Sequence, residues 1–539
     1  MTRFAIAAAA LFAPALAALG IQPAAAADSL VVCTEASPDT MNANLSTANT
    51  TFDVSEQVAD RLVEMQPGTS NLVPGLAESW DISSDGLRYT FHLRHGVKWQ
   101  SSASFHPSRE FNADDVLFTF QRMFDKNHPW NKVGGGYPMF DALIAPPLKA
   151  VTKIDNDTVA FELNRPHAPL LPTLSVQSFS ITSAEYAAAI DKAGGTRDSY
   201  DLNPIGTGPF QFVQYQKDSL IRFRAFHDFW GAKGAQPERA AKVDQLVFAI
   251  TRDPAVRFAK LRANECQVAR YPNPADIPAM RATPGVVVQE ATIASVGYLA
   301  FNTQRKPFDD ARVRQALASA VDLDSLVKAV WQGSGTPTAS VVSPGLFGHS
   351  DTLQPRHQDL ARAKALLAEA GLGNGFSMEL WALPIARAYM PDGRRAAEMI
   401  QADWAKIGVN AKIVTFEWGE YLRRARNGEG DSAMLGGTWD YPDPSQQLIG
   451  LTCEALDTGR NTPKWCNRAY SDLIDQANKV TDISARAKLY QQAQQVIFDQ
   501  VPIMTFADTR VYVPVRTSVT GFKLHFYGGQ PFGGVAVTQ

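Results

Sequence analysis

The chain has 539 residues, of which 45% are hydrophobic and 10% aromatic, so it can bury a large core and should divide into at least two lobes. Its 51 basic and 54 acidic residues give a net charge of −3 and are scattered along the sequence. This balance gives no electrostatic argument for binding nucleic acid or anionic lipid, and the apolar content excludes a largely disordered chain.

The first 27 residues have the pattern of a secretory signal. A positive charge at Arg3 precedes an apolar run from about residue 4 to residue 19, and AAAA stands just before Asp28. We expect cleavage after Ala27 and an exported mature protein. No cysteine stands at the cleavage site, which disfavours a lipid anchor, and no later segment approaches eighteen uninterrupted apolar residues, so we expect no membrane-spanning helix.

The first half, from about residue 29 to residue 288, alternates short strands with turns, as is typical of an α+β fold. LRYTFHLRHGVKW has a hairpin-like alternation, and VDQLVFAITRD predicts a further strand. FNADDVLFTFQRMF predicts a helix, because its apolar residues follow helical spacing after an Asn-Ala-Asp-Asp cap. Asp114 and Asp115 are therefore interpreted as cap residues rather than as a catalytic pair.

After about residue 294, strands alternate with single helices. Helices are predicted for LARAKALLAEAGL, RRAAEMIQADWAKIG and WGEYLRRARNGE, the first two closed by Gly371 and Gly408. Strands are predicted for FSMELWAL, NAKIVTFEW and SAMLGGTW. This alternation favours an α/β lobe built on a parallel sheet with right-handed crossovers.

Four cysteines in an exported chain suggest two disulfides. Cys453 and Cys466 are close in sequence, and a bridge between them would close a short loop; Cys33 and Cys266 would then pair over a long range. Zinc is the competing use, but neither pair has C-x-x-C spacing and no histidine lies nearby. The sequence therefore predicts no metal site at the cysteines.

The stretch LGGTWDYPDPSQQ, residues 435–447, places two carboxylates among glycine, aromatic and proline residues. Its prolines and glycines predict a stiff surface connection. Asp443 is interpreted as an Asp-Pro turn residue that accepts a local backbone N–H. Asp440 has two interpretations, a turn residue or the anion of a small-cation site, because Trp439 and Tyr441 flank it with large apolar faces.

Strand order connects this acid with an arginine. Ligands of open parallel sheets bind outside the carboxyl ends of the strands. Asp440 follows the predicted strand that ends near Trp439, and Arg387 lies in the loop after the strand that ends near Leu383. If the two strands are parallel members of one sheet, the two side chains face one crevice. An acid and an arginine together suit a zwitterion, although on residue type alone Arg387 is better interpreted as a solvated loop residue.

The chain lacks the familiar catalytic patterns. H-E-x-x-H, G-x-S-x-G and the phosphate-binding G-x-x-x-x-G-K-[ST] are absent from the sequence. His92 and His95, three apart on a predicted strand, should point to opposite faces and are poor joint metal ligands. We therefore expect a protein that is not an enzyme and that uses no cofactor. A secreted hydrolase remains the distant alternative and would need a nucleophile and base that the sequence does not show.

Several segments together resemble the peptide-type periplasmic solute-binding proteins of ABC importers, and especially the dipeptide binders among them. They are NLVPGLAESWDISSDGLRYTFHLRHGVKW, FNADDVLFTF, DLNPIGTGPFQF, KPFDDARVRQALASAVD and EMIQADWAKIGVNAKI. The resemblance covers essentially the whole mature chain. It implies a monomeric periplasmic receptor that closes over a short peptide and delivers it to a membrane permease.

The fold that the resemblance implies is α/β and two-lobed, with a ligand cleft between the lobes and an extra α+β subdomain in the N-terminal lobe. The signal would occupy residues 1–27, the first lobe residues 28–292 and the second lobe residues 293–510, and residues 511–539 would return to the first lobe. The four cysteines resemble the two disulfides of the family, Cys33–Cys266 and Cys453–Cys466.

The resemblance also implies roles for individual residues. In dipeptide binders of this family an aspartate holds the ligand's amino terminus and an arginine its carboxylate. By local motif, these are Asp440 in TWDYPDP and Arg387 in LPIARAYMP. TANTTFD resembles the strip of the first lobe that offers polar backbone groups to the peptide, which adds Asn49 and Thr50. Trp439 completes the expected site.

The sequence departs from its relatives beside the acid. They usually have Gly-Trp-Thr-Gly-Asp, whereas this chain has Gly436-Gly437-Thr438-Trp439-Asp440, which displaces the indole by roughly 7 Å along the strand. Pro442 replaces the usual glycine. The ligand's side-chain preference therefore does not carry over. A receptor of the same fold for a nickel chelate, haem or another small zwitterion stays open, although no histidine lies within ten residues of Arg387 or Asp440.

Overall fold

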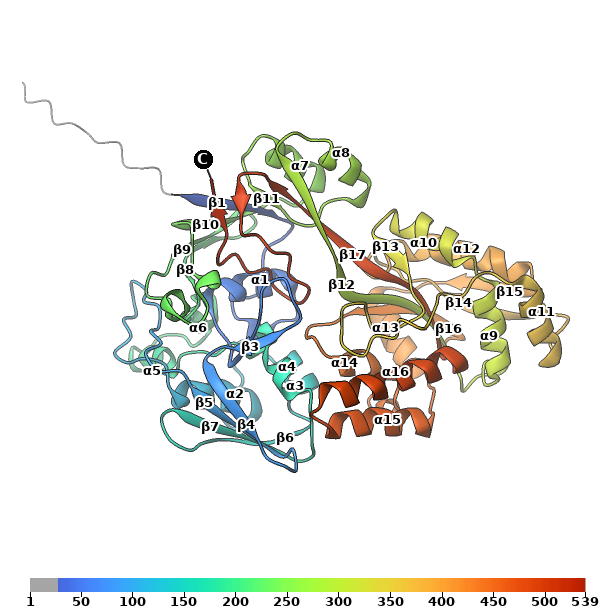
Figure 1. The fold of residues 1–539 in the computed structure, drawn as a ribbon, viewed down its shortest axis with the longest axis horizontal. Helices are drawn as coiled ribbons and strands as arrows, with labels where there is room; N and C mark the ends of the chain where they lie inside the picture. The colour runs from blue at the N-terminus through green and yellow to red at the C-terminus, as the bar shows by residue number, and fades with distance from the viewer. Residues whose placement is uncertain (1–27, 539) are drawn as a thin grey trace, which may run out of the picture.

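The computed structural model describes residues 28–538 and divides them into two lobes (Figure 1). The predicted signal segment lies outside the described residues. Two long strands, β12 (Val286–Phe301) and β17 (Ile503–Arg516), run antiparallel side by side from one lobe into the other. The expected lobe boundaries at residues 292/293 and 510/511 lie within these two strands. Across the described part of the chain, no helix has the length and apolarity needed to span a membrane.

One mixed sheet extends through both lobes in the order β15-β14-β16-β12-β17-β11-β1-β10-β9-β8. Its first-lobe strands are β1 (Ser29–Thr34), β8 (Phe210–Gln216), β9 (Leu220–Ala225), β10 (Gln245–Ile250) and β11 (Val268–Ala269). Its second-lobe strands are β14 (Phe376–Trp381), β15 (Val409–Val414) and β16 (Ser432–Thr438), and β13 (Gly335–Pro337) pairs with β17. The sheet therefore makes one continuous frame out of segments that are far apart in sequence.

The remaining strands form small sheets of the first lobe. An antiparallel sheet of order β4-β5-β7-β6 contains β4 (Ala77–Ile82), β5 (Arg88–Leu93), β6 (Leu148–Lys153) and β7 (Thr158–Leu163). Two further antiparallel sheets have two strands each: β2 (Val63–Met65) pairs with β3 (Leu72–Pro74), and β18 (Val519–Thr520) pairs with β19 (Ala536–Val537). The segment LRYTFHLRHGVKW, for which a hairpin-like alternation was predicted, contains a single strand, β5, and its HGVKW part is not a strand. The antiparallel partner of β5 is β4, which precedes the segment.

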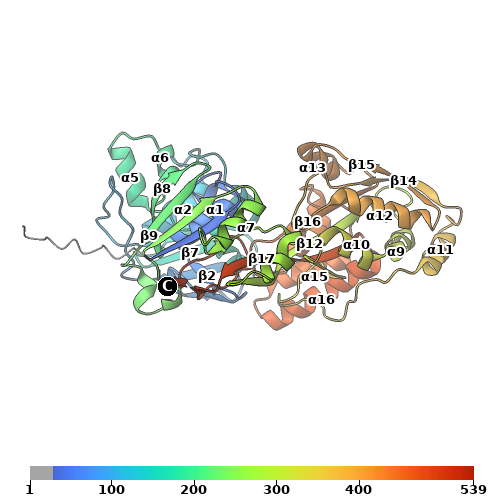
Figure 2. The ribbon, with the colours of Figure 1, turned by 90° about the horizontal axis from the view of Figure 1, so that it is seen from above.

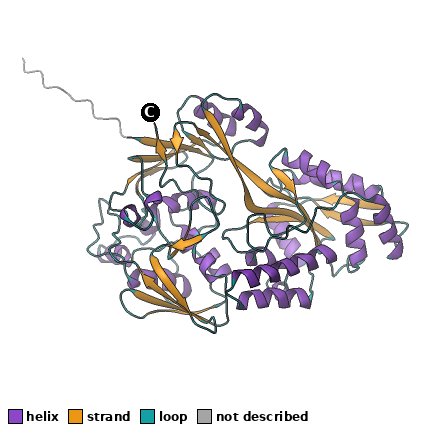
Figure 3. Ribbon diagram, viewed as in Figure 1, coloured by secondary structure: helices purple, strands orange, loops and turns teal. Residues whose placement is uncertain are grey.

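Helices are shared between the lobes, and Figure 3 shows them concentrated around the sheet of the second lobe. The first lobe contains α1 (Asn49–Val58), α2 (Ala113–Phe124), α3 (Pro138–Leu143), α4 (Leu170–Leu174), α5 (Ala184–Lys192), α6 (Asp198–Leu202), α7 (Pro254–Arg262) and α8 (Ile277–Arg281). The second contains α9 (Ala311–Ala320), α10 (Leu323–Trp331), α11 (Leu360–Glu369), α12 (Gly393–Ala405), α13 (Trp418–Asn427), α14 (Ser445–Leu448), α15 (Arg468–Lys479) and α16 (Ile483–Gln500). Short 3-10 turns are η1 (Ala43–Leu45), η2 (Gln177–Phe179), η3 (Trp230–Lys233), η4 (Pro237–Arg239), η5 (Pro274–Asp276), η6 (Ile449–Leu451) and η7 (Cys453–Leu456).

The helices and strands predicted for the second lobe are all present, although β14 ends at Trp381 and β15 at Val414, two and four residues before the predicted segments end. Gly371 and Gly408 have φ of +78° and +82°, the left-handed conformation that glycine adopts without strain after a helix. In the first lobe Asn112 caps α2, and the side chain of Asp115 completes a capping box. The parallel-sheet prediction is only partly right. β14 pairs parallel with β15 and β16, but β16 pairs antiparallel with β12, because β12 enters from the other lobe.

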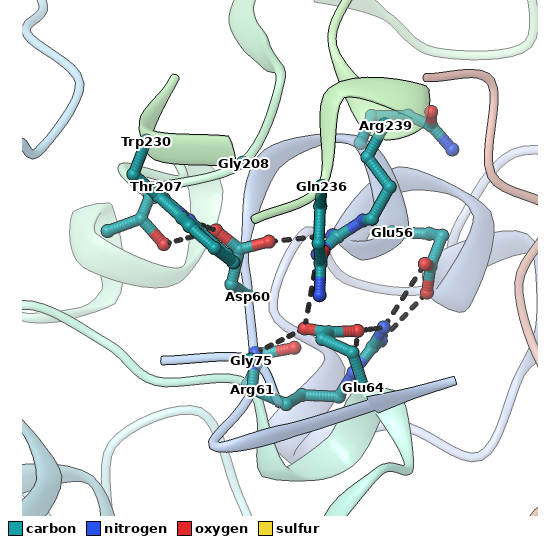
Figure 4. A network of polar contacts seen from close by, with 12 residues as sticks. Glu56, Asp60, Arg61, Glu64, Gly75, Thr207, Gly208, Trp230, Gln236 and Arg239 are labelled. Carbon is teal, nitrogen blue, oxygen red and sulfur yellow. Dashed lines mark hydrogen bonds and ion pairs between the residues drawn. The ribbon is translucent and has the colours of Figure 1, made fainter. Parts of the chain in front are cut away.

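A network of buried charges fixes the interior of the first lobe (Figure 4). Arg61 donates to Glu56 over 2.7 Å and also pairs with Glu64, and Arg239 donates to Asp60 over 2.7 Å. All five side chains are buried. Because each ion has a partner of opposite sign, the cost of removing it from water is offset, and the network holds α1, β2 and η4 together.

Figure 2 shows the two lobes side by side, and they also touch away from the two long strands. Tyr441, from the turn after β16, is 4% exposed and belongs to the same buried cluster as Leu170 and Phe179 of the first lobe. The Ala168 backbone N–H donates to the carbonyl of Asn478 over 2.9 Å. The turn that carries Asp440 is therefore packed against the opposite lobe.

Both expected disulfides are present. Cys33 pairs with Cys266 across 233 residues of chain, and Cys453 pairs with Cys466 across 13, so the described residues contain no free cysteine. On the chain-entropy model the shorter bridge stabilises the fold by roughly 3 kcal/mol. The bridge lies just beyond α14 and restrains the segment that follows the Asp440 turn.

Thiol titration tests in solution whether all four cysteines are held in disulfides. The denatured, unreduced protein should show no reactive thiol, and reduction should release four. Replacing Cys453 and Cys466 with Ala should weaken ligand binding more than it unfolds the second lobe, because the loop that they close follows β16 and the Asp440 turn. Two or more reactive thiols before reduction would contradict the pairing.

Candidate ligand-binding site

Two neighbouring parallel strands bring Arg387 and Asp440 to one edge of the sheet. Leu380 pairs with Ser432, and Trp381 with Ala433, so β14 and β16 run in the same direction. The loop that carries Arg387 follows β14, and Asp440 follows β16. The strand-edge prediction of parallel neighbours is therefore correct for this pair.

A pair of glycines lets the Arg387 loop lie directly against the sheet. Gly297 of β12 pairs with Gly436 of β16. A Cβ atom on Gly297 would lie 2.1 Å from the carbonyl oxygen of Tyr389, and one on Gly436 would lie 2.3 Å from its ring. Only glycine at both positions permits this approach. The loop thus crosses β16 four residues before Asp440.

The Arg387 side chain is exposed and carries no ion-pair partner among residues 28–538. Its guanidinium carbon lies 5.1 Å from the centre of the Trp418 ring, a cation–π contact that supports the side chain without neutralising it. Behind it, the Thr509 hydroxyl donates to the carbonyl of Ala388 over 3.2 Å and fixes the loop to β17. Burial raises the pKa of Tyr389, and the nearby Arg387 guanidinium opposes that rise. The loop therefore presents a free, fixed cation.

Asp440 is a half-buried anion without a cationic partner in the described part of the chain. Its backbone N–H donates to Oε1 of Gln446, and Nε2 of Gln446 donates to its Oδ2, each over 2.9 Å. Burial raises the pKa of Asp440 to about 6, and the Gln446 hydrogen bond opposes that rise. The carboxylate is thus ionised near neutral pH although no cation of residues 28–538 pairs with it. Arg387 and Asp440 form no ion pair with each other.

Trp439 forms a wall beside the acid. Its backbone N–H donates to the carbonyl of Ala294 over 2.8 Å. The indole folds back along the strand, so that a Cβ atom on Gly437 would lie 3.2 Å from it. One face packs on the buried cluster that contains Leu448 and Leu451, and the side chain is half-buried. The unusual tryptophan of this chain therefore occupies the space above a glycine of its own strand.

Asp443 does more than the sequence indicated. Its Oδ1 accepts the local Ser445 N–H over 2.9 Å, as the turn interpretation requires. It also forms a two-pronged ion pair with Arg486 of α16, over 2.7 and 2.9 Å, and Arg486 donates to the Tyr490 hydroxyl over 2.6 Å. Asp443 is 1% exposed. The interpretation as a simple turn residue was incomplete, because the partner lies 43 residues away in sequence.

Asn49 and Thr50 lie in the other lobe. They begin α1, whose N-cap residue Ala48 provides no side-chain cap. Asn49 is exposed and Thr50 half-buried, and within residues 28–538 no hydrogen bond joins either side chain to Arg387 or Asp440. The structure thus brings Arg387, Asp440 and Trp439 together on one lobe and leaves Asn49 and Thr50 on the other.

Sequence reasoning missed Gln446, Asp443 with Arg486, and the glycine pair under Tyr389. Gln446 stands six residues after Asp440, in the first turn of α14, and reaches back because the Asp-Pro turn before α14 reverses the chain. The signal that could have pointed to it is the polar pair Gln446-Gln447 directly after the Asp-Pro turn. Gly297 and Gly436 gave no local signal, because their pairing is long-range.

Comparison with known proteins gives consistent matches. The family described as bacterial extracellular solute-binding proteins, family 5 Middle, matches residues 71–455. The dipeptide-binding protein of Escherichia coli (strain K12) is 48% identical over 526 residues, which cover 97% of this chain and 97% of that protein.

Two solved structures agree with the fold. HbpA2 from Haemophilus parasuis has a TM-score of 0.90 and 40% identity, over 95% of this chain and 100% of that chain. The dipeptide-binding protein from Pseudoalteromonas sp. SM9913, solved with Met-Leu, has a TM-score of 0.77 and 35% identity, over the same shares of the two chains. The expected two-lobed α/β fold is confirmed.

Proposed function

We propose a function from the premise that this chain belongs to family 5 of the bacterial extracellular solute-binding proteins. The protein is the peptide-binding component of an ABC importer: it captures dipeptides, or similarly short peptides, and delivers them to the membrane permease. The E. coli dipeptide-binding protein and the structure with Met-Leu support this class of ligand. The relatives are solute-binding proteins, and we expect no hydrolysis when a peptide is incubated with the protein.

One observation carries the proposal: Asp440 is an uncompensated anion, and Arg387 an uncompensated cation, at one edge of the same sheet. A zwitterion supplies the two missing partners. Its ammonium pairs with the Asp440 carboxylate, and its carboxylate accepts two parallel hydrogen bonds from the planar Arg387 guanidinium. A dipeptide has these two charges at its ends and no other obligatory charge.

The remaining site residues are assigned by their positions. Trp439 would form the wall that contacts a ligand side chain, and Asn49 and Thr50 would offer polar groups from the first lobe when the lobes close. Residues 28–292 with 511–539 would move as one lobe and residues 293–510 as the other, with β12 and β17 as the hinge. The mature protein would begin near Asp28 and act in the periplasm.

Arg387→Gln tests the carboxylate end of the site. The substitution keeps a polar side chain and removes the charge. The binding free energy of a dipeptide should therefore weaken by about 2 to 5 kcal/mol, the usual cost of removing one partner from a desolvated charge pair. A dipeptide with an amidated C-terminus should bind wild-type protein poorly and lose little more against the variant. Isothermal calorimetry measures both affinities.

The matched control is Arg394→Gln on the exposed face of α12, where the partner of Arg394, Glu398, is also at the surface. This variant should bind like the wild type. Full dipeptide affinity in Arg387→Gln would remove Arg387 from the site. Native mass spectrometry of the purified protein separates the proposed peptide ligand from the alternative ligands, a nickel chelate, haem or another zwitterion.

A further inference from the structure

Gln446 makes a closed pair of hydrogen bonds with Asp440. Oε1 accepts the Asp440 backbone N–H, and Nε2 donates to the Asp440 carboxylate, each over 2.9 Å. The reverse orientation of the amide would place N–H against N–H and oxygen against carboxylate oxygen, so the contacts determine which amide atom is which. The side chain therefore holds both the backbone and the carboxylate of the same residue.

This contact divides the two carboxylate oxygens of Asp440. Gln446 occupies Oδ2, and in residues 28–538 no hydrogen bond ends on Oδ1. Asp440 is partly exposed, and its Oδ1 is not one of the buried side-chain atoms of residues 28–538 that lack a partner, so this oxygen keeps contact with solvent. A carboxylate held through one oxygen has its second oxygen aimed in a fixed direction, which is the requirement for receiving an ammonium without reordering the side chain.

Gln446 is itself firmly anchored. Asp443 accepts the Ser445 N–H at the start of α14, and its ion pair with Arg486 fixes that turn to α16. At the end of α14, the Tyr470 hydroxyl donates to the carbonyl of Leu448 over 2.6 Å. Buried polar contacts therefore hold both ends of α14 and fix the position from which Gln446 reaches Asp440.

We infer that Gln446 is a positioning residue of the ammonium site: it aims Oδ1 of Asp440 at the ligand and helps to keep the carboxylate ionised. The inference rests on the proposed function, in which Asp440 receives the amino terminus of a peptide. Gln446 acts through Asp440 and need not touch the ligand.

The electrostatic surroundings of Asp440 agree with this role. Burial raises its pKa, and the Gln446 hydrogen bond is the contact that lowers it. Tyr441, on the same turn, has a pKa raised by burial and stays neutral. Asp443 is paired with Arg486 of α16. Among residues 28–538, Gln446 is therefore the group whose contact stabilises the charged form of the Asp440 carboxylate.

The test is the pH dependence of dipeptide affinity, measured by calorimetry from pH 4.5 to pH 8 with the wild type and Gln446→Met. Binding needs the ionised acid, so wild-type affinity should fall as the pH drops through about 6. Removing a hydrogen bond to a charged acceptor should raise the pH at which affinity falls by about one unit, so affinity should drop roughly fivefold at pH 6 and roughly tenfold at pH 4.5. Gln446→Glu still accepts the Asp440 N–H but places a second carboxylate beside Asp440, so it should raise the pH at which affinity falls by more than Gln446→Met does.

Gln495→Met is the control, because Gln495 also donates to a carboxylate, Asp499, but on the exposed face of α16. Its pH profile should match the wild type. An equal loss of affinity at every pH in Gln446→Met and Gln446→Glu, or no loss, overturns the inference. If Asp440→Asn abolishes the loss of dipeptide affinity at low pH while Gln446→Met leaves the wild-type pH profile unchanged, only the role of Gln446 is wrong. If Asp440→Asn changes neither the affinity nor its pH dependence, the proposed function is wrong as well.

Discussion

Replacing Asp440 with Asn should lower the affinity for a zwitterionic dipeptide by roughly thirtyfold to several-thousandfold. The variant keeps the shape of the side chain and removes its charge. The peptide's ammonium would then lie in the closed site without its counter-ion, and losing one partner of a buried charge pair costs about 2 to 5 kcal/mol. Calorimetry at pH 7 measures the change. Asp472→Asn, an exposed acid of α15, is the control and should leave affinity unchanged.

The same substitution should stabilise the protein without ligand. Burial raises the pKa of Asp440 from 3.8 to about 6 in the folded protein, so the folded state holds a proton that the unfolded state has lost. Wild-type stability should therefore fall, relative to Asp440→Asn, as the pH rises from about 4 to 6, and the difference should stay constant above that range. A shift of this size corresponds to about 3 kcal/mol. Urea unfolding at pH 4 and pH 7.5 gives the comparison.

Stability and affinity thus change in opposite directions at one residue. An acid with a purely structural role would stabilise the fold, and the protein would become less stable when that acid is substituted. If Asp440→Asn is both less stable than the wild type at pH 7.5 and unchanged in affinity, Asp440 is a structural residue of the turn and not an anion reserved for a ligand.

Asp443→Asn should be the most destabilising single change in the site region. Asp443 and the Arg486 side chain are 1% and 5% exposed, and their two hydrogen bonds are 2.7 and 2.9 Å long. Removing the carboxylate would leave the guanidinium buried without an anion, which typically costs about 3 to 5 kcal/mol. Urea unfolding monitored by circular dichroism measures this loss.

The matched control is Asp475→Asn on α15, which breaks the exposed pair with Lys479 and should cost no more than about 0.5 kcal/mol. Affinity gives a second reading, because the Asp443 turn supports α14 and Gln446. We expect weaker dipeptide binding in Asp443→Asn even under conditions where it is fully folded. Unfolding curves that coincide for the two variants would mean that the ion pair stabilises nothing.

The second-lobe elements could be predicted because their information is local. The helical period and terminal glycine of α12, and the apolar runs of β14 and β16, fix their type without reference to the rest of the chain. From these, strand order alone placed Arg387 and Asp440 at one edge. That step needed only the rule that parallel strands end together.

What could not be predicted depends on long-range pairing. β12 turns the parallel sheet into a mixed one because it arrives from the first lobe, which no local period reveals. Asp443 meets Arg486 because α16 crosses under the turn, and a turn residue with a distant partner has the same local sequence as one without. The contact of Gln446 with Asp440 could not be predicted, because it depends on where the chain places α14 after the turn.

The central claim is that Asp440 receives the amino terminus of a peptide, and a calorimetric cycle tests it directly. Four affinities are measured: wild type and Asp440→Asn, each with a dipeptide and with its N-acetylated form, which lacks the ammonium. The account predicts a large loss from acetylation in the wild type and a much smaller one in the variant, because both changes remove the same interaction. Equal losses from acetylation in the two proteins would contradict it.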